Sequence, residues 1–137
     1  MTDKLWLRDP DSSRRKEPRV LIRVFVAPGG LEEAIGFYER LQGTSADMLM
    51  PYPEMDLRLA AVGAFLVIEG DEDSLRPFRA TTGTLLVDDV EPYYERLLAE
   101  GAQVVAPPQR VPVGANFTVR HPDGTVVEYV HHRPERA

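Results

Sequence analysis

Two passages of this chain read alike, and this internal duplication limits the possible folds more than any other feature. An apolar, β-branched run at 20–26 precedes the helical sequence FYERL at 37–41. A second run at 81–87 precedes YYERL at 93–97. The landmarks recur after about 55 to 60 residues, which is the length of a supersecondary unit rather than of a solenoid repeat. The chain is therefore expected to fold as two similar α/β units.

The first copy reads as a strand, a helix and further strands. Apolar residues at helical spacing predict a helix over 31–41, which Gly43 ends. Residues 55–61 and 64–69 read as a hairpin, and 44–54 is less periodic but has room for a short strand.

The second copy repeats this plan. After the strand at 81–87, Asp88 and Glu91 fit a capping box that opens a helix, and Gly101 closes it. A short strand is expected at Val104 and Val105, followed by a proline-rich loop over 106–114. Strands at 116–120 and 125–131 then form a hairpin across Asp-Gly, a strong turn signal.

This order predicts an α+β fold of two βαβββ modules, with a mostly antiparallel sheet and the helices outside. The expected organisation is a charged arm at 1–19, a first module at 20–69, a linker at 70–80, a second module at 81–132 and a tail at 133–137.

Composition excludes several classes of function. With 137 residues, 43% of them hydrophobic and 28% charged, the chain matches a single globular domain. No apolar window is long enough to span a membrane. The net charge of −6 opposes binding to nucleic acid, and the absence of cysteine excludes disulfides and thiolate ligands. Residues 1–6 lack the features of a signal peptide, so we expect a cytoplasmic protein.

These landmarks together resemble a known superfamily. They are Phe37-Tyr38 with Gly43, the segment from Val87-Asp88-Asp89 to Gly101, and the hairpin PDGTVVE at 122–128. In this combination they are similar to the glyoxalase, bleomycin-resistance and extradiol-dioxygenase superfamily, the vicinal oxygen chelate fold. The resemblance covers residues 20–132 and implies a cupped, half-open barrel. It also implies assembly as a homodimer, with each cup formed in one chain or by swapped modules.

Many enzymes of that superfamily hold a divalent metal with one residue from the first and last strand of each module. By resemblance, the usual imidazole positions fall at Leu21 and Thr82, and the acid positions at Val67 or Glu69 and at Glu128. Both imidazoles are missing, and bare carboxylates suit magnesium, calcium or manganese better than zinc, nickel or iron. We therefore expect no cofactor; if a divalent metal binds, Glu128 and Glu69 are its candidate ligands.

Glu128 is the candidate catalytic residue, as a general base or as an acceptor for a ligand. Equally, it could form a structural pair with Arg23, and Glu69 could point into solvent. The predicted ligand-binding residues are Arg23, Phe25, Met50, Tyr52, Phe65, Thr82, Phe117 and Glu128.

The hypothesis is a protein that binds a small apolar or aromatic molecule in the cup, without the usual metal site. The alternative is a lyase, isomerase or dioxygenase that uses Glu128 with a weakly held metal or as a base. A regulatory or interaction module is a third possibility.

Overall fold

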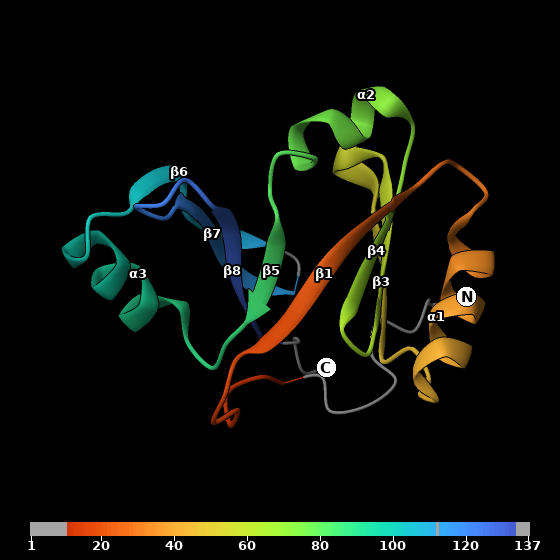
Figure 1. Cartoon of the computed structure of the whole chain (residues 1–137), viewed down its shortest axis with the longest axis horizontal. Helices are drawn as coiled ribbons and strands as arrows, with labels where there is room; N and C mark the ends of the chain where they lie inside the picture. The colour runs from red at the N-terminus through yellow and green to blue at the C-terminus, as the bar shows by residue number, and fades with distance from the viewer. Residues whose placement is uncertain (1–10, 112, 134–137) are drawn as a thin grey trace. The chain divides into compact units, whose positions relative to one another are not determined.

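The fold is known from a computed structural model that describes residues 11–111 and 113–133. Its contacts divide the chain into two compact units. Residues 21–80 belong to the first, and the described residues of 11–20 and 81–133 belong to the second. Figure 1 shows both units with their helices and strands.

The first module is a four-stranded sheet with one long helix. Its elements are β1 (Arg19–Val26), α1 (Leu31–Gln42), β2 (Met48–Tyr52), the 3-10 turn η1 (Pro53–Met55), β3 (Leu57–Val62) and β4 (Phe65–Glu69). The strand order is β2-β3-β4-β1; β1 runs parallel to β4 and the other pairs are antiparallel. Helix α1 buries Leu31 against Ala60 and Val67 of the sheet. Gly43 ends the helix in the left-handed conformation, with φ of 65°.

The second module repeats this topology. Its elements are β5 (Gly83–Leu86), α3 (Val90–Ala99), β6 (Gln103–Val111), β7 (Gly114–Arg120) and β8 (Val126–His132). The strand order is β5-β8-β7-β6, with β5 parallel to β8. Helix α3 covers a core that includes Phe117 and Tyr129, whose rings stack at 5.0 Å. The prediction of an α+β fold of two βαβββ modules is confirmed.

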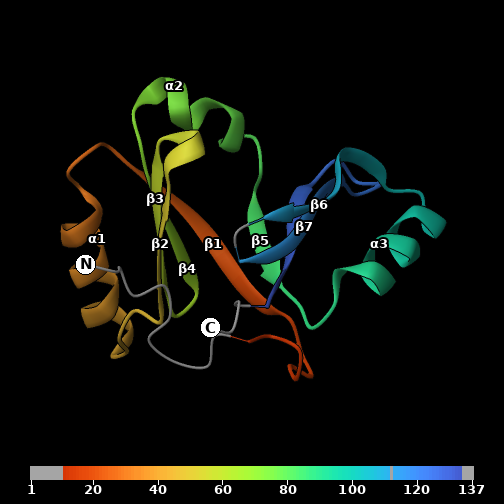
Figure 2. The same ribbon diagram turned by 180° about the vertical axis from the view of Figure 1, so that it is seen from behind.

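Two short helical segments occupy the predicted linker, namely α2 (Glu72–Leu75) and η2 (Arg76–Phe78). In both views, α2 lies at the same end of the first module as the turn η1 (Figures 1 and 2). The side chain of Asp71 caps α2 by accepting the Ser74 N–H at 2.8 Å.

The predicted arm lies partly outside the described residues, as does most of the tail at 133–137. Within its described part, Ser12 is buried against the second module. Its hydroxyl donates to the Val87 carbonyl at 2.6 Å and accepts the His132 N–H at 2.9 Å. This part of the arm is therefore attached to the core of that unit.

Two local predictions were wrong. The segment 106–114, expected as a loop, mostly continues β6, since the strand runs from Gln103 to Val111. Prolines are tolerated there because β6 pairs only with β7 in its own module, and an edge strand needs fewer N–H donors. The N-cap of α3 is Asp89, not Asp88; its side chain accepts the Glu91 N–H at 3.0 Å.

Candidate functional site

Glu128 lies on the face of the second module's sheet that points away from α3. Alternation along β8 puts Tyr129 on the helix side, in the core, and Glu128 on the opposite side. On this face, Thr84 of β5 and Thr118 of β7 lie directly opposite Glu128. The buried apolar side chains of Leu86, Val126 and Val130 lie further along the strands. Glu128 itself is partly exposed. The arrangement is a carboxylate among polar neighbours, with buried apolar side chains on either side along the strands.

Two neutral side chains hold this carboxylate. Thr84, directly opposite on β5, donates its hydroxyl to Oε1 at 2.9 Å. Asn116 of β7 donates its side-chain amide to Oε2 at 2.7 Å. Neither residue was singled out from the sequence. Asn116 gave a usable signal, because asparagine is depleted in strands and stands here inside a strand pattern.

The residues around Glu128 do not fit the divalent metal that the superfamily resemblance of the chain implies. The donors are one carboxylate, one hydroxyl and one amide that presents its NH₂ group. Imidazole, which zinc, nickel and iron prefer, is not among them. Within residues 11–111 and 113–133, no cluster of three or more His, Cys, Asp or Glu side chains could hold a metal ion.

The predicted binding residues of the first module share one face. Arg23 and Phe25 of β1 and Met50 and Tyr52 of β2 lie on the side of the sheet away from α1. Leu21, at one of the expected imidazole positions, is on this face and buried. The linker at 70–80 also contacts residues of this face. Arg23 donates to the Phe78 carbonyl at 3.1 Å, and the guanidinium of Arg79 lies 5.0 Å from the Phe25 ring centre.

Three other predicted residues lie elsewhere. Phe65 packs against Tyr38 of α1, with ring centres 4.4 Å apart, on the helix side of its sheet. Phe117 is fully buried under α3, on the side opposite Glu128. Thr82 is exposed and precedes β5, and it is Thr84, two residues later, that contacts Glu128. The predicted pair of Arg23 and Glu128 would join the two modules and stays a prediction.

Glu69 lies on the helix side of the first module's sheet, where it closes an ion-pair network. Arg58 of β3 donates to its carboxylate through Nε at 2.6 Å and Nη2 at 2.9 Å. The backbone N–H groups of Gly29 and Leu31, at the start of α1, donate to the same carboxylate at 2.9 and 3.1 Å. Arg58 also makes a two-pronged contact with Glu32 on the first turn of α1.

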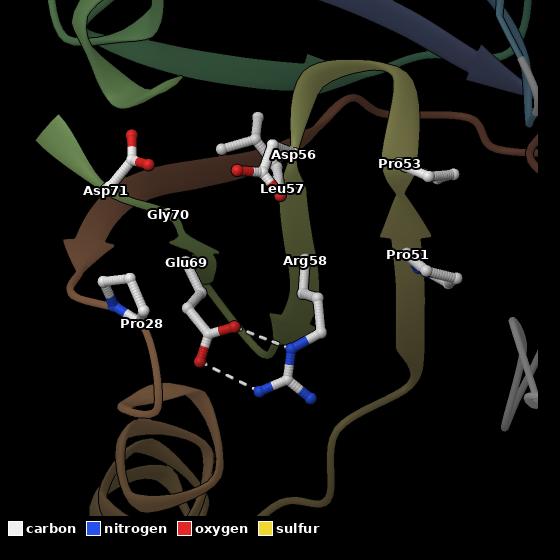
Figure 3. A pocket seen from close by; sticks show the side chains of 9 residues that line it. All are labelled: Pro28, Pro51, Pro53, Asp56, Leu57, Arg58, Glu69, Gly70 and Asp71. Carbon is white, nitrogen blue, oxygen red and sulfur yellow. Dashed lines mark hydrogen bonds and ion pairs between the residues drawn. The ribbon is translucent and has the colours of Figure 1, made fainter. Parts of the chain in front are cut away.

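This network lies at one side of a pocket of about 390 Å³ in the first module (Figure 3). Prolines 28, 51 and 53 and Leu57 give it apolar walls, and Asp56 and Asp71 line it as well. Four of the five N–H donors of Arg58 are used by Glu69 and Glu32. The chain's own carboxylates thus occupy the positions that an external anion would need.

The pKa values of Glu69, Glu32 and Arg58 are shifted by their mutual contacts. Hydrogen bonding from Arg58 holds the pKa of Glu69 below its usual range, against the opposing effect of burial. Arg58 lowers the pKa of Glu32 in the same way. The two carboxylates in turn raise the pKa of Arg58, Glu69 more than Glu32. All three groups are therefore fixed in their charged forms.

Three comparisons with known proteins bear on the fold. The model of the Glyoxalase/Bleomycin resistance protein/Dioxygenase superfamily matches residues 21–129. An uncharacterized protein from Methanosarcina mazei, known from a crystal structure, is 36% identical with a TM-score of 0.74; the match covers 90% of this chain and 98% of that one. None of the curated proteins matches significantly by sequence.

More distant structures share the fold alone. Methylmalonyl-CoA epimerase from Mycobacterium tuberculosis is 17% identical with a TM-score of 0.59, over 93% of this chain and 94% of that one. Methylmalonyl-CoA epimerase from Streptomyces coelicolor, in complex with 2-nitronate-propionyl-CoA, is 18% identical with a TM-score of 0.53. That match covers 83% of this chain and 96% of the other.

Proposed function

The chain belongs to the Glyoxalase/Bleomycin resistance protein/Dioxygenase superfamily, and from this premise we propose that it binds a small molecule with an apolar or aromatic body, without the family's metal. Glu128 is the polar anchor of the proposed site. One observation carries the proposal: a partly exposed carboxylate, held by Thr84 and Asn116, has buried apolar side chains on either side along the strands. Binding sites for small molecules combine an apolar lining with a few fixed polar groups in this way.

The carboxylate of Glu128 suits the role of acceptor. The hydroxyl of Thr84 and the amide of Asn116 donate to it and fix its orientation. A ligand hydroxyl or amine gains a charge-assisted hydrogen bond there. The second group of predicted binding residues, Arg23, Phe25, Met50 and Tyr52, is proposed to contribute apolar contacts.

The test is a binding screen on the full chain with a panel of aromatic small molecules, bleomycin included, followed by calorimetric titration. We expect at least one compound to bind and Glu128→Gln to weaken that binding at least tenfold. Glu95→Gln makes the same chemical change on the exposed surface of α3 and should bind as the wild type does. Equal affinity in the Glu128 and Glu95 variants would remove Glu128 from the site.

The metal-free part of the proposal has its own test. The protein is dialysed against Mn²⁺, Ni²⁺ or Zn²⁺ in turn and its metal content is measured. We expect no stoichiometric binding that depends on Glu128. One tightly bound ion per chain, lost in Glu128→Gln and accompanied by lyase or oxygenase activity, would favour the enzyme alternative instead.

We further propose a homodimer. Phe37 and Leu41, one helical turn apart on α1, are 52% and 61% exposed and offer an apolar surface for association. Light scattering during size-exclusion chromatography measures the mass directly, and a monomer at all concentrations would contradict the proposal. The expected cytoplasmic location stays a prediction; among the described residues, no helix is long and apolar enough to cross a membrane.

A further inference from the structure

The orientation of the Asn116 amide is fixed by its neighbour. Its contact with Oε2 of Glu128 is 2.7 Å long. A carboxylate accepts hydrogen bonds and donates none, so Asn116 must present its NH₂ group there. The amide oxygen, Oδ1, therefore points away from that contact.

Oδ1 of Asn116 is buried and has no hydrogen-bond partner among the described residues. Leaving a buried acceptor unpaired is unfavourable. Most buried polar side-chain atoms in proteins are paired, so an exception calls for an explanation. A group absent from the chain itself is the simplest one.

The neighbouring strand is irregular beside Asn116. Asn116 pairs with Gln109 on β6, and the register shifts by one residue between Ala106 and Gln109. The two residues inside this bulge are Pro107 and Pro108, which have no backbone N–H. Bulges are common beside binding sites, where they redirect the edge of a sheet.

The unpaired oxygen lies close to the Glu128 carboxylate. The two polar atoms of an amide are about 2.2 Å apart. Adding the 2.7 Å contact gives at most about 5 Å between Asn116 Oδ1 and Glu128 Oε2. One nitrogen with several N–H groups can reach two oxygens at that separation, at about 2.8 Å from each.

We propose that the ligand of this site is an organic amine whose primary ammonium group donates one N–H to Asn116 Oδ1 and another to Glu128. This inference rests on the proposed function and narrows it to a class of ligand. A hydroxyl has only one hydrogen to donate and cannot serve both acceptors. The apolar side chains Leu86, Val126 and Val130 share this face of the sheet. The net charge of −6 favours the approach of a cation.

The experiment compares three probes with the same phenyl ring. They are 2-phenylethylamine, its N,N,N-trimethyl derivative, which keeps the charge but has no N–H, and 2-phenylethanol. Calorimetric titration of the wild-type chain should show the amine binding at least tenfold more tightly than either of the others. Equal affinity for the amine and the trimethyl compound would show that charge alone acts, and would overturn the inference.

A second measurement observes Asn116 directly. The chain contains a single asparagine, so labelling with ¹⁵N-asparagine gives one side-chain NH₂ signal. The amine should shift this signal in a saturable way and the alcohol should not. An unchanged signal on saturation with the amine would place that ligand elsewhere, and the inference would fall.

Variants separate the two acceptors. Asn116→Ala and Glu128→Gln should each weaken amine binding at least tenfold, with folding checked by circular dichroism. Glu95→Gln, on the exposed surface of α3, is the matched control for Glu128→Gln and should bind the amine as the wild type does. The comparison of probes on wild-type protein stands even if a variant fails to fold.

The outcomes distinguish this inference from the proposed function. If the three probes bind equally well, or if only other compounds of the panel bind, the ammonium group is wrong and small-molecule binding stands. If no compound binds at all, both proposals fall, and a trapped water is then the partner of Asn116.

Discussion

Replacing Glu69 by glutamine is expected to lower the free energy of unfolding by about 2–3 kcal/mol. The carboxylate is only 7% exposed and accepts hydrogen bonds from Arg58, Gly29 and Leu31. Glutamine has the same shape but only one acceptor oxygen. Its NH₂ group must therefore face another donor, either Arg58 or the N–H groups at the start of α1.

The magnitude follows from the surroundings of the pair. Breaking a fully buried ion pair costs about 3–5 kcal/mol, because the remaining charge is left without a partner. Here Arg58 is 42% exposed and keeps Glu32, which reduces the cost. The lost negative charge at the N-terminus of α1 adds about 0.3–1 kcal/mol. The matched control Glu32→Gln removes a carboxylate whose side chain is 69% exposed, so it should cost only about 0–1 kcal/mol.

The assay is urea denaturation followed by far-UV circular dichroism, with an unchanged m-value as the sign that only stability has changed. The pH dependence supplies a second check. Because Arg58 lowers the pKa of Glu69, folding favours the charged form. That stabilisation is present above the ordinary value of 4.5 and is lost as the pH falls through the lowered pKa. The difference between wild type and Glu69→Gln should therefore shrink below about pH 4.5. A cost no greater than that of Glu32→Gln, or a difference that does not change with pH, would refute the reasoning.

Three further predictions concern the second module. Burial and the nearby Arg133 lower the pKa of His131, whose Nδ1 accepts the Val90 N–H at 3.1 Å. As the pH falls, the His131 side chain of the unfolded chain therefore binds a proton before that of the folded chain. The free energy of unfolding should fall as the pH drops below about 6.5. Urea denaturation at about pH 7.5 and 5.5 measures this difference, which His131→Gln should lose. Phe117→Ala should cost about 3–5 kcal/mol in the same assay, because the ring is fully buried; a cost near 1 kcal/mol would contradict its place in the core. Ser12→Ala should cost about 1–3 kcal/mol, since Val87 and His132 each lose a buried partner, and an unchanged denaturation midpoint would show that the arm does not stabilise the fold.

Local patterns were enough to predict the elements of both modules. The helix predicted over 31–41 runs from Leu31 to Gln42, and the Asp-Gly turn joins β7 and β8. Strand β6 was missed because Pro107 and Pro108 are usual in loops. Only its position in the sheet, where it pairs with β7 alone within its module, explains why a strand tolerates them there.

The side of the sheet that each strand residue faces was harder to predict than the strands themselves. Alternation shows which residues share a face, but it does not show which face the helix covers. Phe65 and Phe117 therefore appeared suitable for a pocket, although both pack under helices. The contacts of Arg58 with Glu69, and of Asn116 with Glu128, join residues 11 and 12 positions apart on neighbouring strands. The first contact depends on the register of β3 against β4, which no turn signal as strong as Asp-Gly fixes. The second is diagonal across the Asp-Gly hairpin and depends on which side chains reach each other.

The two acids that the duplication put in equivalent roles have separate roles in the structure. Glu69 lies under α1, and its partners are a guanidinium and the N-terminus of that helix. Glu128 lies on the face away from α3, and a hydroxyl and an amide donate to it. A carboxylate already held by a two-pronged arginine contact is a poor acceptor for a further ligand. The glutamine variants should therefore separate the two roles, since Glu69→Gln acts on stability while Glu128→Gln acts on binding. If both variants changed the same property, the division of roles between the modules would be wrong.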